Sequence, residues 1–170
     1  MQPALDNEQD DFAWPFIPKP ALGEHVMGYV RRLVEANGLD SMRPFWTSTQ
    51  LTELTPVSPP HLWNRLRTVT RLEPEYIERM QWPLIGEAAR GLVSFLGYPV
   101  RKKFLVSKIL RHCSACTRES AILRHSWSVY HVTACASHGA QLLDRCHVCS
   151  MKLPLFQKRR SGIAAAAGPI

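Results

Sequence analysis

The thiols of this chain, with one imidazole, fall into three pairs that could bind a metal ion. Each pair has two residues between its members, and together they contain all five cysteines: Cys113 with Cys116, Cys135 with His138, and Cys146 with Cys149. A two-residue gap lets a tight turn direct both ligands at one tetrahedral Zn²⁺. This spacing therefore predicts a zinc-binding module in the C-terminal part of the chain.

Two groupings of these ligands are open. In the first, Cys113, Cys116, Cys135 and His138 form a closed Cys3His shell, which leaves no position for water and is therefore structural. Cys146 and Cys149 would then form a second, partial site, because no cysteine or histidine follows them. The second grouping uses the first and third pairs around one ion and leaves Cys135 and His138 idle. We favour the first grouping for that reason.

Catalytic zinc chemistry is not supported by the surrounding sequence. A zinc deaminase needs a His-x-Glu element before a Pro-Cys-x-x-Cys pair, and neither half is present. The HExxH, Walker A and GxSxG motifs are also absent from the sequence. His112 and His147 each adjoin a cysteine ligand, and we interpret both as solvated imidazoles rather than auxiliary ligands. The sequence predicts a protein that is not an enzyme.

Composition indicates a globular chain that works in a reducing compartment. Hydrophobic residues make up 45% of the 170 residues. No apolar run approaches the roughly 18 residues that a membrane span needs. The first eleven residues are polar and acidic, unlike a secretory signal. An odd number of cysteines at ligand spacing favours metal binding over disulfides.

Charge is distributed unevenly along the chain. Residues 1–100 contain nine Lys/Arg and twelve Asp/Glu, a net charge of −3, whereas residues 101–170 contain twelve Lys/Arg and two Asp/Glu, a net charge of +10. A basic half of this kind indicates a polyanionic partner, and nucleic acid is the first candidate. The alternative is a solvated basic surface that only aids solubility. The predicted nucleic-acid contacts are Arg101, Lys102, Lys103, Lys158, Arg159 and Arg160.

Periodicity divides the chain into an extended arm (1–22), a helical domain (23–105), a zinc-ribbon module (106–155) and a tail (156–170). Apolar residues recur at helical spacing from Val26 to Val34, and Asn37-Gly38 supplies a stop. A second helix begins after Pro59-Pro60, and a third opens at Pro74. Another helix is predicted within residues 84–98, and a strand over residues 126–132. The predicted fold class is mainly α, with a helix-turn-helix-like N-terminal domain and a small zinc-ribbon β module.

The two helices around Leu72-Glu73 have the outline of a helix-turn-helix. However, Glu75 and Glu78 on the second helix would repel phosphates, and the basic residues lie on the first helix. We therefore favour packing or protein docking over DNA reading by this element. The docking anchors are predicted to be exposed aromatic residues in proline-flanked segments, namely Trp14, Phe16, Phe45 and Trp46. The alternative is that these side chains cover the helical core.

Several segments resemble the TniQ/TnsD family. They are Pro20–Glu24, Arg31–Leu33, Asn37–Leu39, the stretch 66–80, Arg111–Cys116, Trp127, Cys135–Gly139 and Leu142–Cys149. The family shows an N-terminal helix signature, a cysteine pair, a tryptophan strand, a Cys-x-x-His-Gly knuckle and a leucine-rich run into another cysteine pair. The chain departs from the family in lacking prolines inside the knuckles and a partner pair for Cys146 and Cys149.

The resemblance implies a non-catalytic adaptor that selects target sites for DNA transposition. Such proteins link a target-recognition complex to the AAA+ regulator TnsC, which recruits the transposase. The chain is similar to short members in CRISPR-associated transposons, for which DNA and guide RNA are expected partners and the bacterial cytoplasm, at the nucleoid, the expected location. The alternative function is a zinc-ribbon transcription regulator that binds DNA. A zinc hydrolase or deaminase is the least favoured.

Overall fold

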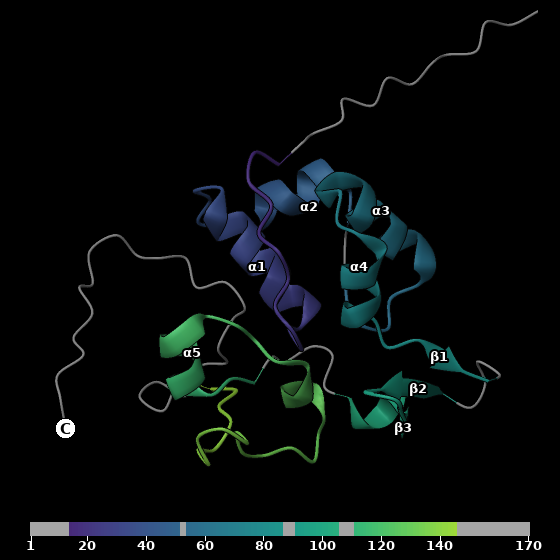
Figure 1. The fold of residues 1–170 in the computed structure, drawn as a ribbon, viewed down its shortest axis with the longest axis vertical. Coiled ribbons are helices and arrows are strands. Elements are labelled where there is room, and N and C mark those ends of the chain that lie inside the picture. Colours follow the sequence, from purple (N-terminus) through teal and green to yellow (C-terminus); the bar gives the residue numbers. More distant parts are fainter. Residues whose placement is uncertain (1–13, 52–53, 87–90, 106–110, 146–170) are drawn as a thin grey trace, which may run out of the picture.

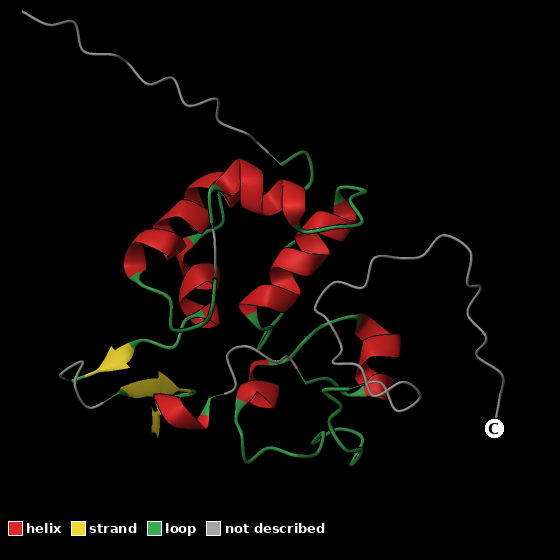
Figure 2. Cartoon of the chain, turned by 180° about the vertical axis from the view of Figure 1, so that it is seen from behind, coloured by secondary structure: helices red, strands yellow, loops and turns green. Residues whose placement is uncertain are grey.

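The computed structural model describes residues 14–51, 54–86, 91–105 and 111–145. In chain order its elements are α1 (Val26–Ala36), α2 (Arg43–Thr49), α3 (Pro60–Thr70), α4 (Pro74–Met80), β1 (Leu84–Ile85), β2 (Leu92–Phe95), β3 (Tyr98–Arg101), η2 (Lys102–Phe104), α5 (Ser114–Ser120) and η3 (His125–Ser128). The first four helices gather on one side, and the sheet and the α5 region lie below them (Figure 1, Figure 2). The fold is thus mainly helical, as predicted.

Helix α1 confirms the strongest periodic signal of the sequence. Its N-cap is His25, whose Nδ1 accepts a hydrogen bond from the Met27 amide at 3.1 Å. Seven of its residues are buried, including the apolar series from Val26 to Val34. The helix ends at Asn37, and Gly38 follows with a φ of 74°. Glycine adopts this left-handed conformation at little cost, so the predicted stop is confirmed.

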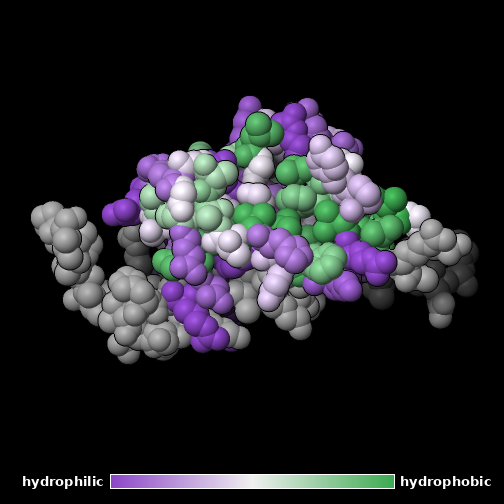
Figure 3. Space-filling view, turned by 90° about the horizontal axis from the view of Figure 1, so that it is seen from below, coloured by the Kyte–Doolittle hydropathy of each residue, from purple (hydrophilic) through white to green (hydrophobic). Residues whose placement is uncertain are grey.

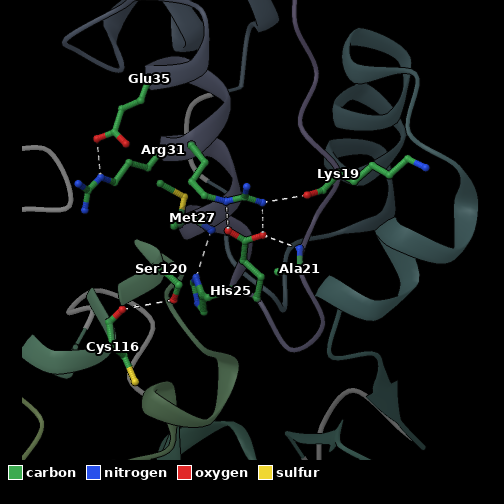
Figure 4. Close-up of polar contacts among 10 residues, drawn as sticks. Lys19, Ala21, His25, Met27, Arg31, Glu35, Cys116 and Ser120 are labelled. Atoms are coloured by element: carbon green, nitrogen blue, oxygen red, sulfur yellow. Dashed lines mark hydrogen bonds and ion pairs between the residues drawn. The ribbon is translucent and has the colours of Figure 1, made fainter. Parts of the chain in front are cut away.

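The N-terminal arm is fastened to α1 by a buried carboxylate. Arg32 donates to both oxygens of Glu24 at 2.7 Å, and the Ala21 amide donates to Oε2 of Glu24 at 2.8 Å. The same guanidinium reaches the Lys19 carbonyl at 2.9 Å (Figure 4). The Glu24 side chain is fully buried. Such a charge is tolerated in the interior because its partner and hydrogen bonds replace water.

The remaining helices were only partly predictable. Helices α3 and α4 begin at the predicted prolines, and the break between them contains Arg71 in a left-handed conformation with a φ of 50°. Helix α2 has no counterpart among the predicted elements. It has only seven residues, three of them Ser or Thr, and Phe45 is its fully buried anchor. Tertiary packing rather than propensity therefore stabilises it.

The prediction of a helix within residues 84–98 is wrong. This stretch instead builds an antiparallel sheet in the order β1-β2-β3, in which Leu84 pairs with Val93 and Phe95 pairs with Tyr98. Leu96 and Gly97 form the tip of the β2–β3 hairpin with φ values of 50° and 85°. Two consecutive positive φ values are what a tight hairpin turn requires, and a helix cannot contain them.

The prediction of a strand over residues 126–132 is also wrong. Its first residues belong to η3, and Val129 makes only an isolated bridge with Leu105. The backbone carbonyls of this segment are turned toward Arg111, which donates to those of Trp127 at 3.0 Å, Tyr130 at 3.3 Å and Val129. The segment is therefore held by η3 and by this guanidinium rather than by a regular strand ladder.

A single hydrophobic core joins the helices to the cysteine-containing region. The core cluster includes Val30 and Leu33 of α1 together with Cys113, Leu123 and Trp127. Backbone hydrogen bonds cross the same junction, from His25 to Leu123 at 2.7 Å and from His125 to Gly23 at 2.9 Å. The predicted limits at residues 22, 105 and 155 remain predictions. None of the described helices combines the length and the apolar character that a membrane crossing demands.

Candidate metal centre

The structure brings together the four residues of the first predicted grouping. The ligand atoms of Cys113, Cys116, Cys135 and His138 all lie within 4.8 Å of one another, and the three thiols are free and buried. Among the described residues this is the one group of three or more His, Cys, Asp or Glu that could hold a metal ion. Cys146, His147 and Cys149 lie outside the described residues, so the second grouping and the partial second site are not tested.

Four of the six separations between the ligand atoms of this cluster lie close to the edges of a metal-centred tetrahedron. The Sγ atoms of Cys116 and Cys135 are 3.6 Å apart. The Nδ1 atom of His138 lies 3.2 Å from Cys116 Sγ and 3.7 Å from the Sγ atoms of Cys113 and Cys135. Metal–ligand distances of about 2.3 Å for sulfur and about 2.0 Å for nitrogen give tetrahedral edges of roughly 3.5–3.8 Å. The donor set therefore fits one tetrahedral ion.

Each ligand pair is positioned by its own local structure. Cys113 is the N-cap of α5 and Cys116 lies in its first turn, where the Thr117 amide donates to the Cys113 carbonyl at 3.0 Å. Cys135 and His138 lie on a tight turn closed by a hydrogen bond from the Gly139 amide to the Cys135 carbonyl at 2.8 Å. Gly139 has a φ of 61°, a conformation that favours glycine.

One short backbone bridge joins these two ligand turns, and another closes the second turn. His112 and Leu143 exchange hydrogen bonds of 3.0 and 2.8 Å, and Ala134 is bridged to Gln141. The first bridge connects the residue before Cys113 to the strand-like segment after the His138 turn. In the described residues the three-stranded sheet precedes the cluster, so the predicted β module around the ligands is reduced to isolated bridges.

A carboxylate completes the arrangement around His138. Its Nε2 atom lies 2.9 Å from Oε1 of Glu119, on α5. Metal-bound histidines usually donate their second ring nitrogen to such a partner, which fixes the tautomer and the ring orientation. Glu119 follows Cys116 by three residues on the helix, so both face the same side. Glu119 was not among the predicted site residues, because no helix was predicted at α5.

Electrostatics within the cluster favour thiolate at one position. Burial acts to raise the pKa of Cys135, but hydrogen bonds from His138 and from backbone amides outweigh it and lower that pKa. Burial raises the pKa of Cys116. Hydrogen bonds to Cys135 and Glu119 raise the pKa of His138 to about 9. A bound cation would displace the remaining protons, because only deprotonated Cys and His act as ligands.

Three of the six predicted nucleic-acid contacts lie among the described residues. Arg101 ends β3, Lys102 and Lys103 belong to η2, and all three side chains are exposed. Lys103 Nζ lies over the Phe104 ring, 5.2 Å from its centroid. Lys158, Arg159 and Arg160 lie outside the described residues.

The prediction that four aromatic residues are exposed is wrong for two of them. Trp14 and Phe45 are buried, and their ring centroids are 5.7 Å apart. Trp46 is half-buried and packs edge-on against Phe45 at 4.9 Å. Phe16 is 58% exposed, as predicted. Hydrophobic burial explains the difference, because Phe45 and Trp14 fill the space between the arm and α2. Their roles as docking anchors remain predictions.

Two buried histidines were also missed. His25 and His125 are almost fully buried, with ring centroids 5.9 Å apart, and Trp82 Nε1 donates to His125 Nδ1 at 3.0 Å. Desolvation lowers the pKa of His25 to about 3 and that of His125 to about 4. The predicted solvated imidazole of His112 is instead half-buried, at its bridge with Leu143.

Comparison with known proteins identifies the family. A family model described as TniQ matches residues 15–142. The matched range contains all four residues of the metal cluster, Glu119, and the helices and sheet that precede them. The comparison with curated proteins gives no match. Because the matched range covers well over half of the sequence, the chain belongs to the TniQ family.

Proposed function

We propose that this protein is a non-catalytic adaptor in DNA transposition, which links a target-DNA recognition complex to the AAA+ regulator TnsC. The observation that carries the proposal is the TniQ match over residues 15–142, which includes both the helices and the Cys3His cluster. TnsC would recruit the transposase, so the contact of this protein with transposase is indirect. We place this activity in the bacterial cytoplasm, at the nucleoid when the complex assembles.

The Cys3His cluster is proposed to hold one structural Zn²⁺. Three sulfurs and one nitrogen suit zinc, and four protein ligands leave no open position for catalysis. The cluster belongs to the same hydrophobic core as α1. Zinc bound there would stabilise the junction between the two halves of the protein rather than an isolated finger.

Phe16 is the proposed contact to TnsC on the N-terminal side. Its backbone is fixed by two hydrogen bonds to the Asn37 side chain, at 2.9 and 2.7 Å, yet its ring is largely exposed. Because the backbone of Phe16 is already fixed, a partner has to order only the side chain on binding. The 1–100 half, with its net charge of −3, has no general attraction to phosphate. A protein partner therefore suits this side better than DNA.

Co-sedimentation with TnsC tests the proposal. The full chain should pellet with filaments of the TnsC encoded beside it, in the presence of nucleotide and DNA. Phe16→Ala should weaken this interaction at least several-fold, while Leu22→Ala, at another exposed apolar position of the arm, should not. Failure of the full chain to bind any neighbouring AAA+ protein, together with sequence-specific binding to duplex DNA, would favour the alternative of a zinc-ribbon transcription regulator.

A further inference from the structure

An exposed aromatic and basic surface lies where the sheet meets the metal-binding half. We define the stacking patch as Lys102, Lys103, Phe104, Tyr130 and His131. The Tyr130 amide donates to the Phe104 carbonyl at 2.7 Å, and Leu105 is bridged to Val129. Two segments far apart in the sequence thus form one surface. Neither contributes a residue to the metal cluster.

The rings of the stacking patch contact one another. His131 lies between two aromatic rings, with centroid distances of 5.1 Å to Phe104 and 5.7 Å to Tyr130. Lys103 Nζ lies over the Phe104 ring, 5.2 Å from its centroid. The patch therefore places a cation, two aromatic rings and an imidazole within a short distance of one another.

Tyr130 is exposed although its backbone is fixed. Its side chain is 65% accessible, so it is one of the few large aromatic residues that the described surface leaves open. Its amide is bound to Phe104, and its carbonyl accepts from Arg111 at 3.3 Å. Because the backbone of Tyr130 is already fixed, a partner that engages this ring has to order the side chain but not the segment that carries it.

The positive charge around the stacking patch indicates which class of partner it could bind. The segments 91–105 and 120–143, which build the patch and its surroundings, contain no Asp or Glu, while Arg101, Lys102 and Lys103 project as three consecutive exposed cations. The nearby Asp144 interacts electrostatically with Arg111. Hydrophobic and hydrophilic residues lie side by side over the lower face of the molecule (Figure 3). A partner with flat apolar surfaces and regularly spaced negative charges fits this combination.

We propose that the stacking patch binds single-stranded nucleic acid, with an unpaired base stacked on Tyr130 and the adjoining phosphates bound by Arg101, Lys102 and Lys103. Aromatic side chains beside a basic track are how proteins hold single strands without reading sequence. Duplex DNA buries its base faces in the helical stack, so Tyr130 would gain nothing from it. This inference goes beyond the proposed adaptor function, which needs no direct nucleic-acid contact, and gives a form and a site to the contact that the sequence predicts at residues 101–103.

Fluorescence anisotropy with labelled oligonucleotides tests the inference on the full, zinc-loaded chain. The probes are a 15-mer of deoxythymidine, a 15-mer of uridine and a 15-base-pair duplex. Both single strands should bind more tightly than the duplex. Equal affinity for the deoxythymidine and uridine strands would indicate stacking without recognition of the 2′-hydroxyl. Tighter binding of the uridine strand would identify RNA as the natural partner. Tighter binding of the duplex would overturn the proposal.

Matched variants locate the contact. Tyr130→Ala should weaken single-strand binding roughly 10-fold, and Tyr130→Phe should restore it, because stacking needs the ring rather than the hydroxyl. Tyr98→Ala is the matched control, because it removes an exposed tyrosine next to the hairpin tip, outside the stacking patch. It should change the affinity for single strands less than about two-fold, which is the usual scatter between independent substitutions. Lys103→Ala should lower the slope of log binding constant against log salt concentration by about 0.7, because one phosphate contact is lost. Lys19→Ala, which removes a lysine of the arm, should leave that slope unchanged. Equal losses from Tyr98→Ala and Tyr130→Ala would contradict the assignment.

TnsC co-sedimentation separates this inference from the proposed function. Tyr130→Ala should pellet with TnsC as the unmodified protein does. If it loses TnsC while oligonucleotide binding is unchanged, the patch is a protein surface and the inference fails. If no oligonucleotide binds but TnsC does, the inference fails and the adaptor function stands.

Discussion

Glu119 and His138 meet across the edge of the metal cluster, with 2.9 Å between Oε1 of the carboxylate and Nε2 of the imidazole. Nδ1 of the same ring faces the three thiols, at 3.2–3.7 Å from their Sγ atoms. One nitrogen is thus directed to the metal position and the other to an acidic partner. This pairing couples α5, which supplies Cys116, to the turn that supplies Cys135.

Removal of the Glu119 carboxylate should weaken zinc binding without abolishing it. Glu119→Ala is expected to lower zinc affinity roughly 10- to 100-fold, because the ring of His138 loses the partner that fixes its tautomer. Competition with a chromophoric chelator measures the change. Arg118→Ala, at an exposed neighbour on α5, is the matched control and should leave affinity unaltered. If the Glu119→Ala protein binds zinc as tightly as the unmodified protein, the carboxylate has no part in the site.

Zinc content should distinguish the two possible ligand groupings. Elemental analysis of zinc-replete protein is expected to give one ion per chain, and Cys135→Ser should lose it. Cys146→Ser is the control that should retain the ion. The opposite pattern, with zinc lost from Cys146→Ser and kept by Cys135→Ser, would establish the second grouping. Two ions per chain would mean that Cys146 and Cys149 find further ligands.

The spacing of ligands and apolar residues predicted the parts of this fold that depend on local sequence. Helix α1 followed from a complete apolar stripe, and the convergence of Cys113, Cys116, Cys135 and His138 followed from two-residue gaps. The helix period and each ligand turn act over a few residues, and the two turns converge because one tetrahedral ion needs four ligands. In contrast, α2 is short and depends on the burial of Phe45 by distant segments.

The two wrong secondary-structure predictions have different physical causes. Residues 126–132 are rich in strand formers, but Arg111 occupies three of the carbonyls there. Residues 84–98 contain Gly86, Gly91 and Gly97, all at positive φ, and these turns interrupt the segment that was predicted to be a helix. Propensity describes what a segment can form, whereas a distant side chain or an obligatory turn decides what it does form.

A close approach at the junction of the two halves should make Gly28 intolerant of a side chain. A Cβ atom at this position would lie 2.9 Å from Leu123 Cβ and 3.3 Å from the Leu123 amide nitrogen. Gly28→Ala should therefore destabilise the protein, because overpacking costs about 1–3 kcal/mol and exceeds the gain of about 1 kcal/mol in helix propensity. Urea denaturation measures the free energy of unfolding. Gly28→Val should cost more, and a net stabilisation by alanine would mean that α1 can shift away from Leu123.

The last prediction concerns the loss of stability in mild acid. His25 and His125 have folded pKa values of about 3 and about 4, below the ordinary 6.5, because burial disfavours their charged forms. As pH falls through about 6.5, the unfolded chain takes up protons at both histidines while the folded protein does not. The stabilising effect of the neutral histidines is therefore complete above the unfolded pKa and is lost progressively as pH falls to the folded pKa, about 4 for His125 and about 3 for His25. From pH 7 to pH 5, each histidine should remove about 2 kcal/mol from the free energy of unfolding.

A His25→Asn variant isolates this effect, since asparagine can still cap α1 by accepting from the Met27 amide, as His25 does at 3.1 Å, and does not titrate. Its free energy of unfolding should fall less steeply between pH 7 and pH 5 than that of the unmodified protein, by about 2 kcal/mol over that range. Zinc loss in acid contributes to both proteins alike, provided that both carry the same metal content at pH 7. Identical slopes would show that His25 is not held neutral by burial between α1 and Trp82, whose ring centroid lies 6.3 Å away.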